Sequence, residues 1–226
     1  MHASSVIETR RRRGAPRRAP PRALLTLLAG LALPVAADVT PVEQDPATLV
    51  RQLFERLFVS LGEARAAHDA GSTRVSALVD ALLAPHFDAD YTAHLVLGAQ
   101  WRLATDAQRQ RCARALYRRL LRTYADAVAQ WTPQRVRILP LQQDAAALQV
   151  SVRTEVARSD GSPTAVDYRL RRDADAWKIY DVIVDGASYA RTWHDDIATE
   201  VAQHGLEAAL ARLEQGAEAV TSPAGP

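Results

Sequence analysis

Cysteine is almost absent from this chain: Cys112 is the only one among 226 residues. A single cysteine cannot form an internal disulfide, so a small disulfide-stabilised scaffold is excluded. Cys112 has the apolar spacing of a core residue and no histidine near it in sequence, which favours a buried, inert thiol over a catalytic nucleophile. With 48% apolar and 24% charged residues, the chain can bury a core, which excludes wholesale disorder.

The sequence also lacks a generally basic surface, although its formal net charge is +2. Residues 1–37 hold seven of the 28 basic residues and one of the 26 acidic residues, so the rest of the chain has a net charge of −4. General nucleic-acid binding depends on a basic surface that displaces counterions. We therefore expect no nucleic-acid partner.

No apolar run is comfortably long enough to cross a bilayer. A basic stretch ends at Arg22, and the 15 uncharged, mostly apolar residues 23–37 that follow fall short of the roughly 20 that a membrane helix needs. Small residues precede Asp38, as at a signal-peptidase site. Residues 1–37 are thus predicted to be a secretory signal peptide cleaved after Ala37. A retained membrane anchor and twin-arginine export are the alternatives; no cysteine stands at the site for a lipoprotein.

Helical periodicity dominates the first part of the remaining chain. Asp45-Pro46 is typical of a helix start, and the pair Thr105 and Gln108 has the spacing of a capping box. Apolar residues recur every three to four positions, and they predict helices that start at Pro46, cover 75–83 before Pro85, cover 91–96, and run from 106 to Pro133.

From residue 134 the apolar period becomes two. This alternation predicts strands over 135–141, 148–156, 166–170 and 177–184, joined by short turns. The last strand is apolar on both faces, as expected where both are covered. Helices are expected over 187–203 and 206–215 with a stop at His204-Gly205, followed by a disordered tail, 216–226. The predicted fold class is α+β, with a helical layer packed on a twisted four-stranded antiparallel sheet.

Catalytic patterns are scarce. His194 is followed by two aspartates, but no second histidine lies one helical turn away to complete a metal site, so a solvated helix face is expected. Four arginines share another helical face, where a solvated surface competes with recognition of anionic lipid or an acidic partner. We predict that they face solvent and help docking: Arg111, Arg114, Arg118 and Arg122.

Several segments resemble one known family. These are Leu97-Gly98-Ala99-Gln100-Trp101-Arg102, the capped long helix after it, Val166-Asp167-Tyr168, and above all Trp177-Lys178-Ile179-Tyr180-Asp181-Val182 with Gly186-Ala187-Ser188. Together with the order of helices and strands, they are similar to the MlaC family of periplasmic phospholipid-binding proteins, also called toluene-tolerance proteins. Thr192-Trp193-His194 departs from the Asn-Tyr-Arg that relatives often carry there.

The resemblance implies a single phospholipid-binding domain over 38–215, with an apolar lipid pocket between the sheet and the helical layer. It implies a soluble periplasmic carrier that shuttles phospholipid between an outer-membrane lipoprotein–porin complex and the inner-membrane Mla ABC transporter, and so maintains outer-membrane lipid asymmetry. Such a protein would not be an enzyme and would need no metal or cofactor, because phospholipid is its cargo.

Nine residues are candidates for phospholipid contact. Seven are apolar-face positions of the expected sheet, and two would close the pocket from the helical side: Val150, Val152, Val166, Tyr168, Leu170, Val182 and Val184, with Leu97 and Trp101. Ordinary core residues have the same composition, so each could also belong to the core.

Two other functions remain open. A small isomerase or dehydratase with a similar architecture would use Asp181 with Tyr168 or Tyr180 as an acid/base set. Asp181 is otherwise expected to be a buried, hydrogen-bonded structural group, because an apolar strand cannot hold an unpaired charge cheaply. The third possibility is a periplasmic protein-binding module without a small ligand.

Overall fold

The structure is a computed structural model. It describes residues 45–129, 132, 135–141, 147–158, 161–174 and 176–218, all of which belong to one folded unit. The expected signal peptide, 1–37, lies outside the described residues.

Four helices come first, as the periodicity predicted: α1 (Pro46–Ala66), α2 (Ser72–Leu83), α3 (Ala89–Leu97) and α4 (Asp106–Ala129), with 3₁₀ turns at Ala84–His86 and Gly98–Arg102. The Asp45 side chain accepts a hydrogen bond from the Thr48 backbone N–H at 2.9 Å, which caps α1. At the start of α4 the capping box is reciprocal: Gln108 N–H donates to Thr105 Oγ1 at 3.2 Å, and Thr105 N–H donates to Gln108 Oε1 at 2.9 Å.

The sheet is antiparallel, in the order β1-β2-β3-β4-β5. Its strands are β1 (Val136–Ile138), β2 (Gln149–Ala157), β3 (Pro163–Asp173), β4 (Ala176–Val184) and β5 (Ala187–Ser188). The predicted α+β fold is confirmed, with one strand more than expected. The additional strand, β5, has two residues that turn back and pair with Ile183 and Val184. Such a short strand leaves no alternating pattern to read in the sequence.

A β-bulge explains why β4 is apolar on both faces. Arg169 pairs with Asp181, whereas Leu170 pairs with Ile179, so Tyr180 is an extra residue in β4. Tyr180 is covered by α3, where its ring meets that of Tyr91 edge-on at 5.1 Å between centroids. Consecutive residues of β4 are therefore buried, as the sequence indicated.

Helix α5 (Tyr189–Glu218) is broken where the sequence predicted a stop. Gly205 has a non-helical backbone with φ 83° and ψ 167°. A left-handed φ is inexpensive only for glycine, so this residue sets the kink. The helix continues to Glu218, three residues into the expected tail.

Asp181 joins the sheet to α5. It is 3% exposed, and its carboxylate accepts hydrogen bonds from Ala190 N–H at 3.0 Å and Ser188 Oγ at 2.7 Å; Arg169 Nη1 lies 3.4 Å away. A carboxylate at this position satisfies free N–H groups at the start of a helix. The expected structural role of Asp181 is confirmed.

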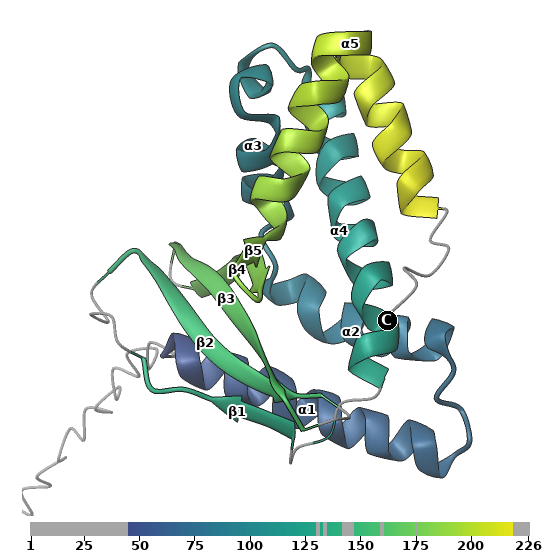
Figure 1. The fold of residues 1–226 in the computed structure, drawn as a ribbon, viewed down its shortest axis with the longest axis vertical. Helices are drawn as coiled ribbons and strands as arrows, with labels where there is room; N and C mark the ends of the chain where they lie inside the picture. Colours follow the sequence, from purple (N-terminus) through teal and green to yellow (C-terminus); the bar gives the residue numbers. More distant parts are fainter. Residues whose placement is uncertain are drawn as a thin grey trace, which may run out of the picture. The chain divides into compact units, whose positions relative to one another are not determined.

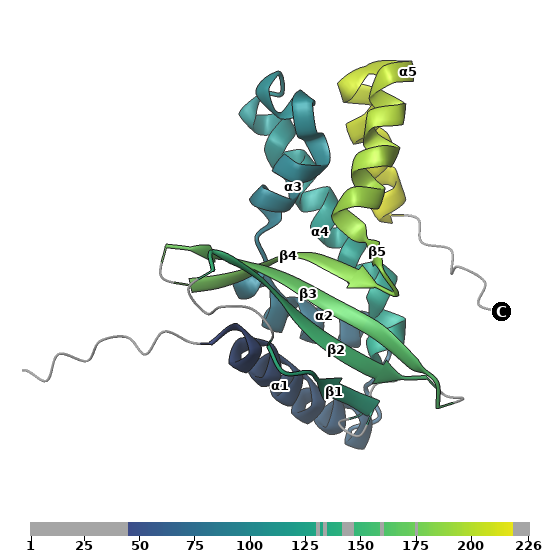
Figure 2. The ribbon, with the colours of Figure 1, turned by 60° about the vertical axis from the view of Figure 1, so that its left-hand side comes forward.

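The buried residues form two clusters. Helices α3, α4 and α5 stand side by side beyond the β4 edge of the sheet and share one core, which includes Cys112 (Figures 1 and 2). Helices α1 and α2 share the other core with the sheet. Burial raises the pKa of the Cys112 thiol to about 12, so the prediction of an inert thiol agrees with its environment.

The expectation of a solvated face is wrong for His194. Its ring is partly buried, and Nδ1 lies 2.9 Å from the carbonyl oxygen of Val96. Gly98, with φ 52°, leaves room for that ring, since a Cβ there would lie only 2.7 Å from His194 Cε1. His194 of α5 thus packs against the end of α3.

Within the described part of the chain, no helix is long and apolar enough to cross a membrane. The same residues contain no group of three or more His, Cys, Asp or Glu side chains that could hold a metal ion.

Candidate functional site

A cavity of about 470 Å³ lies between α1, α2 and α4 on one side and the sheet on the other. Its helical wall consists of Val50, Leu53, Phe54, Leu57, Val79, Leu82, Leu83, Leu120, Leu121 and Val128. Its sheet wall consists of Val156, Ala157, Arg158, Thr164, Val166, Tyr168, Ile179, Val182 and Val184, and Arg135 completes the lining.

The interior of the cavity is apolar. Aliphatic side chains make up most of both walls, and the Phe54 and Tyr168 rings meet edge to face, 5.9 Å apart between centroids. Burial raises the pKa of the Tyr168 phenol, so this group stays neutral. Such a lining attracts a hydrocarbon ligand and offers little to a polar one.

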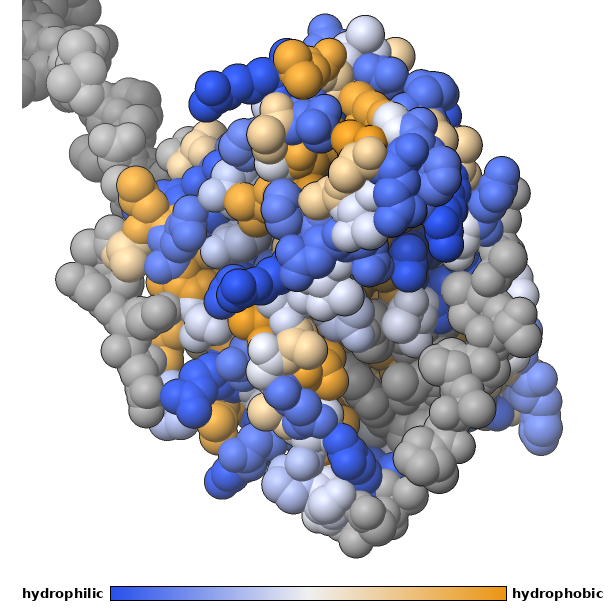
Figure 3. All heavy atoms as spheres, turned by 45° about the horizontal axis from the view of Figure 1, so that its top comes forward, coloured by the Kyte–Doolittle hydropathy of each residue, from blue (hydrophilic) through white to orange (hydrophobic). Residues whose placement is uncertain are grey.

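The surface contrasts with this interior. On the face drawn in Figure 3, apolar side chains occur in small groups separated by hydrophilic ones. Among the described residues drawn on that face, therefore, no broad apolar area competes with the cavity for a hydrocarbon ligand.

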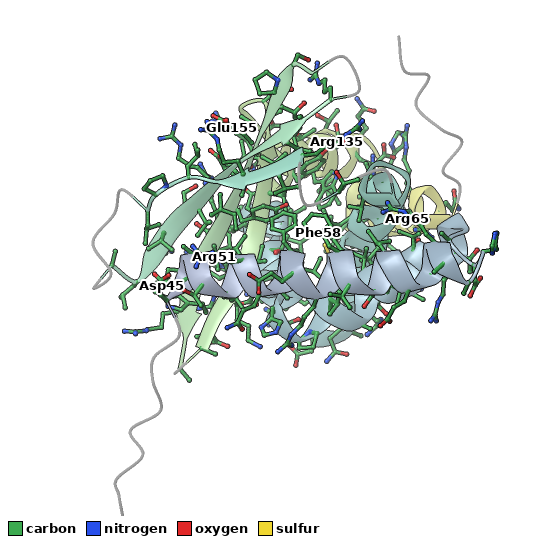
Figure 4. All side chains as sticks on the ribbon, turned by 90° about the horizontal axis from the view of Figure 1, so that it is seen from below. Asp45, Arg51, Phe58, Arg65, Arg135 and Glu155 are labelled. Atoms are coloured by element: carbon green, nitrogen blue, oxygen red, sulfur yellow. The ribbon has the colours of Figure 1, made fainter. Side chains whose placement is uncertain are left out.

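One end of the cavity is polar and open to solvent. Arg158 is exposed; its guanidinium pairs with Asp185 at 2.8 Å and donates to Thr164 Oγ1 at 2.6 Å. Arg135 lies at the same end, across from Phe58 of α1 in the view of Figure 4. Among the described residues that line the cavity there is no carboxylate.

The structure brings four of the nine predicted contact residues into the lining: Val166, Tyr168, Val182 and Val184. Val150, Val152 and Leu170 lie on the same sheet but are buried in the core shared with α1 and α2. Leu97 is buried in the other core, and Trp101 lies at its edge under the Arg109 guanidinium, 4.8 Å from the ring centroid. Lipid contact by any of the nine stays a prediction.

The helical wall of the cavity differs from the predicted one, because Leu97 and Trp101 are not part of the lining. The residues that do form this wall include Val50, Leu53, Phe54 and Leu57, on the apolar face of the helix predicted to start at Pro46, and Leu82 and Leu83 of the helix predicted over 75–83. A core-facing residue and a cavity-lining residue obey the same periodicity, so spacing alone could not separate them.

The four arginines predicted to share one face of α4 have different surroundings. Arg111 pairs with Glu214 at 2.9 Å and with Glu207, both on α5, so its expected role as a solvent-facing docking residue is wrong. The acidic partner expected for it belongs to the chain itself. Arg114 and Arg118 are exposed, in agreement with the prediction that they face solvent. For Arg122 that prediction is wrong, because its Nε and Nη2 atoms are buried.

The proposed acid/base set is not assembled. Asp181 accepts the hydrogen bonds that start α5 and does not line the cavity, whereas Tyr168 does. Tyr180 Oη donates to Gln149 Oε1 at 3.2 Å. Of these three residues, only Tyr168 therefore faces the cavity, while Asp181 and Tyr180 lie outside its lining.

Comparison with known proteins identifies the family. Residues 51–215, well over half of the chain, match the MlaC protein family. The chain belongs to the MlaC family. The resemblance noted in the sequence is thereby confirmed.

Named relatives and a solved structure agree with this assignment. Toluene tolerance protein ttg2D of Pseudomonas putida is 28% identical over 188 residues, covering 81% of this chain and 83% of the relative. The intermembrane phospholipid transport system binding protein MlaC of Haemophilus influenzae is 19% identical over 180 residues, covering 77% and 83%. A phospholipid-binding protein from Ralstonia solanacearum, solved in complex with a phospholipid, superimposes with a TM-score of 0.70 at 26% identity, covering 77% of this chain and 97% of that one.

Proposed function

We propose that this MlaC-family chain is a soluble phospholipid carrier that holds acyl chains in the cavity between α1, α2, α4 and the sheet. The observation that carries the proposal is the cavity itself, which is apolar within and polar at one solvent-exposed end. The similar Ralstonia protein was solved in complex with a phospholipid, which supports the same ligand class here.

The physical need for such a carrier follows from the cost of exposing lipid chains to water. Two acyl chains contain about 30 methylenes, and at about 0.8 kcal/mol each their exposure costs on the order of 24 kcal/mol. Unassisted passage through an aqueous gap is therefore negligible. A carrier must replace membrane contact with comparable apolar contact, and its function requires no catalytic group.

The proposed route runs through the periplasm. After cleavage behind Ala37, the carrier would exchange phospholipid between an outer-membrane lipoprotein–porin complex and the inner-membrane Mla ABC transporter, and so maintain outer-membrane lipid asymmetry. The relative from Haemophilus is named as the binding protein of an intermembrane phospholipid transport system, which supports this assignment.

Native mass spectrometry of the purified mature chain, with organic extraction of the same sample, tests the proposal. We expect one diacyl phospholipid to co-purify, and lipid-free protein to take phospholipid up from vesicles. Protein that neither co-purifies with phospholipid nor takes it up from vesicles would overturn the carrier function and favour a module that binds other proteins.

N-terminal sequencing of the exported protein tests the route. Asp38 as the first residue of a periplasmic fraction is expected. An intact 1–37 segment on membrane-bound protein would instead indicate a retained anchor.

A further inference from the structure

We propose that Arg135 forms a phosphate-binding site at the polar end of the cavity and thereby fixes the orientation of the bound lipid. This inference rests on the proposed carrier function and adds to it a headgroup contact.

The strand register gathers the polar lining residues at one end of the sheet. Val136, the first residue of β1, pairs with Val156, and Val156 pairs with Thr164. Arg135, directly before β1, therefore lies near the end of β2, where Ala157 and Arg158 follow Val156. The start of β1, the end of β2 and the start of β3 therefore meet there. The opposite wall at this end is helical and apolar.

Charge balance distinguishes the two arginines. Arg158 is neutralised by Asp185. The nearby Arg137–Glu155 pair on the exposed side of the sheet is also balanced. Within the described part of the chain, no side chain forms a hydrogen bond or ion pair with the Arg135 guanidinium, and Arg135 as a whole residue is partly buried. Among the described residues that line the cavity, Arg135 is thus the cation without a carboxylate partner.

A phosphate group suits this position. Guanidinium binds phosphate through two parallel charge-assisted hydrogen bonds, and these strengthen when the group is partly removed from water. In a diacyl phospholipid the phosphate is attached close to the two acyl chains. Acyl chains that enter the apolar interior would therefore bring the phosphate to the polar end, next to Arg135.

The test is a competition between two lipids with the same acyl chains, a phosphatidyl lipid and a diacylglycerol that lacks phosphate. Lipid-free protein is loaded from mixed vesicles, and the ratio of the two bound lipids is measured. We expect wild type to prefer the phosphatidyl lipid, and R135Q to reduce that preference about tenfold, the lower end of the range for a charge-assisted pair. R135K keeps the charge but cannot form two parallel hydrogen bonds, so its lipid ratio should lie between those of wild type and R135Q.

R137Q is the matched control, because Arg137 lies two residues further along the chain, in β1, outside the cavity lining, and is paired with Glu155. It should keep the wild-type ratio. Uptake of diacylglycerol by R135Q shows that its cavity is intact. A wild type without preference, or an R135Q protein with the wild-type ratio, would overturn the phosphate site while the carrier function stands. A wild type that binds neither lipid would overturn the carrier function itself.

A second arm identifies the source of the phosphate. Inorganic phosphate is titrated into lipid-free protein and followed by phosphorus NMR. Line broadening with wild type and R137Q, but not with R135Q, would show that the site takes phosphate without acyl chains. If no broadening occurs while R135Q lowers the lipid ratio, the site takes only the phosphate of a bound lipid, which is the result that we expect.

Discussion

Two valines of the sheet give the sharpest test of where the cavity ends and the core begins. Val152 is 1% exposed and belongs to the core shared with α1 and α2. Val184 is partly buried and lines the cavity near its polar end. We expect the same substitution, valine to aspartate, to have different consequences at the two positions.

At Val152 the aspartate should prevent folding. The change removes a buried aliphatic side chain, a loss of about 1.5–3 kcal/mol, and places a carboxylate without a partner in the core, which costs several kcal/mol more. The total approaches the roughly 5–15 kcal/mol by which a domain of this kind is stable. V152D should therefore show no cooperative urea transition.

At Val184 water can reach the new carboxylate when the cavity is empty, so V184D should fold. Acyl chains would have to displace that water, at a cost of about 3 kcal/mol, which corresponds to a loss of lipid affinity on the order of 100-fold. V184L, which stays apolar, should retain lipid.

Urea unfolding followed by circular dichroism, with phosphorus measured per protein after extraction, separates these outcomes. The assignment of Val184 to the cavity is contradicted if V184D unfolds as V152D does, because Val184 would then behave as a core residue. The assignment also fails if V184D retains phospholipid at the wild-type level.

Three further predictions concern the helical core. Hydrogen bonds from Arg111 hold the pKa values of Glu207 and Glu214 below their usual range. These two carboxylates therefore add to the free energy of unfolding above about pH 4.5, and this stabilisation is lost as the pH falls through their folded-state pKa values. In urea titrations at several pH values, R111Q should lose less stability than wild type as the pH is lowered. Cys112 should react with a thiol reagent only after denaturation, and rapid reaction of the native protein near pH 8 would show that its burial is wrong. G98A should lower the free energy of unfolding by about 1–3 kcal/mol, as measured in urea, and an unchanged midpoint would contradict the close approach of the His194 ring.

Much of the fold could be predicted because local signals and tertiary contacts agree. The Asp45 cap, the Thr105–Gln108 capping box and the kink at Gly205 occur where the sequence placed them. Each depends on residues within one turn of one another. Such signals act at the level of the local backbone and survive packing.

The interactions that the sequence did not reveal are long-range. Whether Arg111 faces water depends on α5, about 100 residues away, and only the packing of α4 on α5 brings Glu207 and Glu214 to it. The partly buried position of the His194 ring likewise depends on Gly98, because a glycine has no Cβ to occupy the space of the ring. A helical pattern identifies an outward face but not which other helix covers it.

The candidate site was predicted in part for a similar reason. Alternation selected the correct face of the sheet, and Val166, Tyr168, Val182 and Val184 indeed line the cavity. Along that same face, Val150, Val152 and Leu170 are covered. Whether a residue on this face lines the cavity or belongs to the core depends on how closely α1 and α2 approach its strand position. Periodicity contains no information about that distance.

The cavity also bears on how a carrier could release its lipid. Each methylene withdrawn from water contributes about 0.8 kcal/mol, and a tenfold change in an equilibrium corresponds to about 1.4 kcal/mol. Loss of cavity contact with about two methylenes therefore shifts the partition of a lipid roughly tenfold. Because the wall is divided among three helices and the sheet, a small displacement of one helix by a partner would remove that much contact. Tight retention in water and release at a membrane complex are thus compatible in one cavity, without a catalytic group or a large rearrangement.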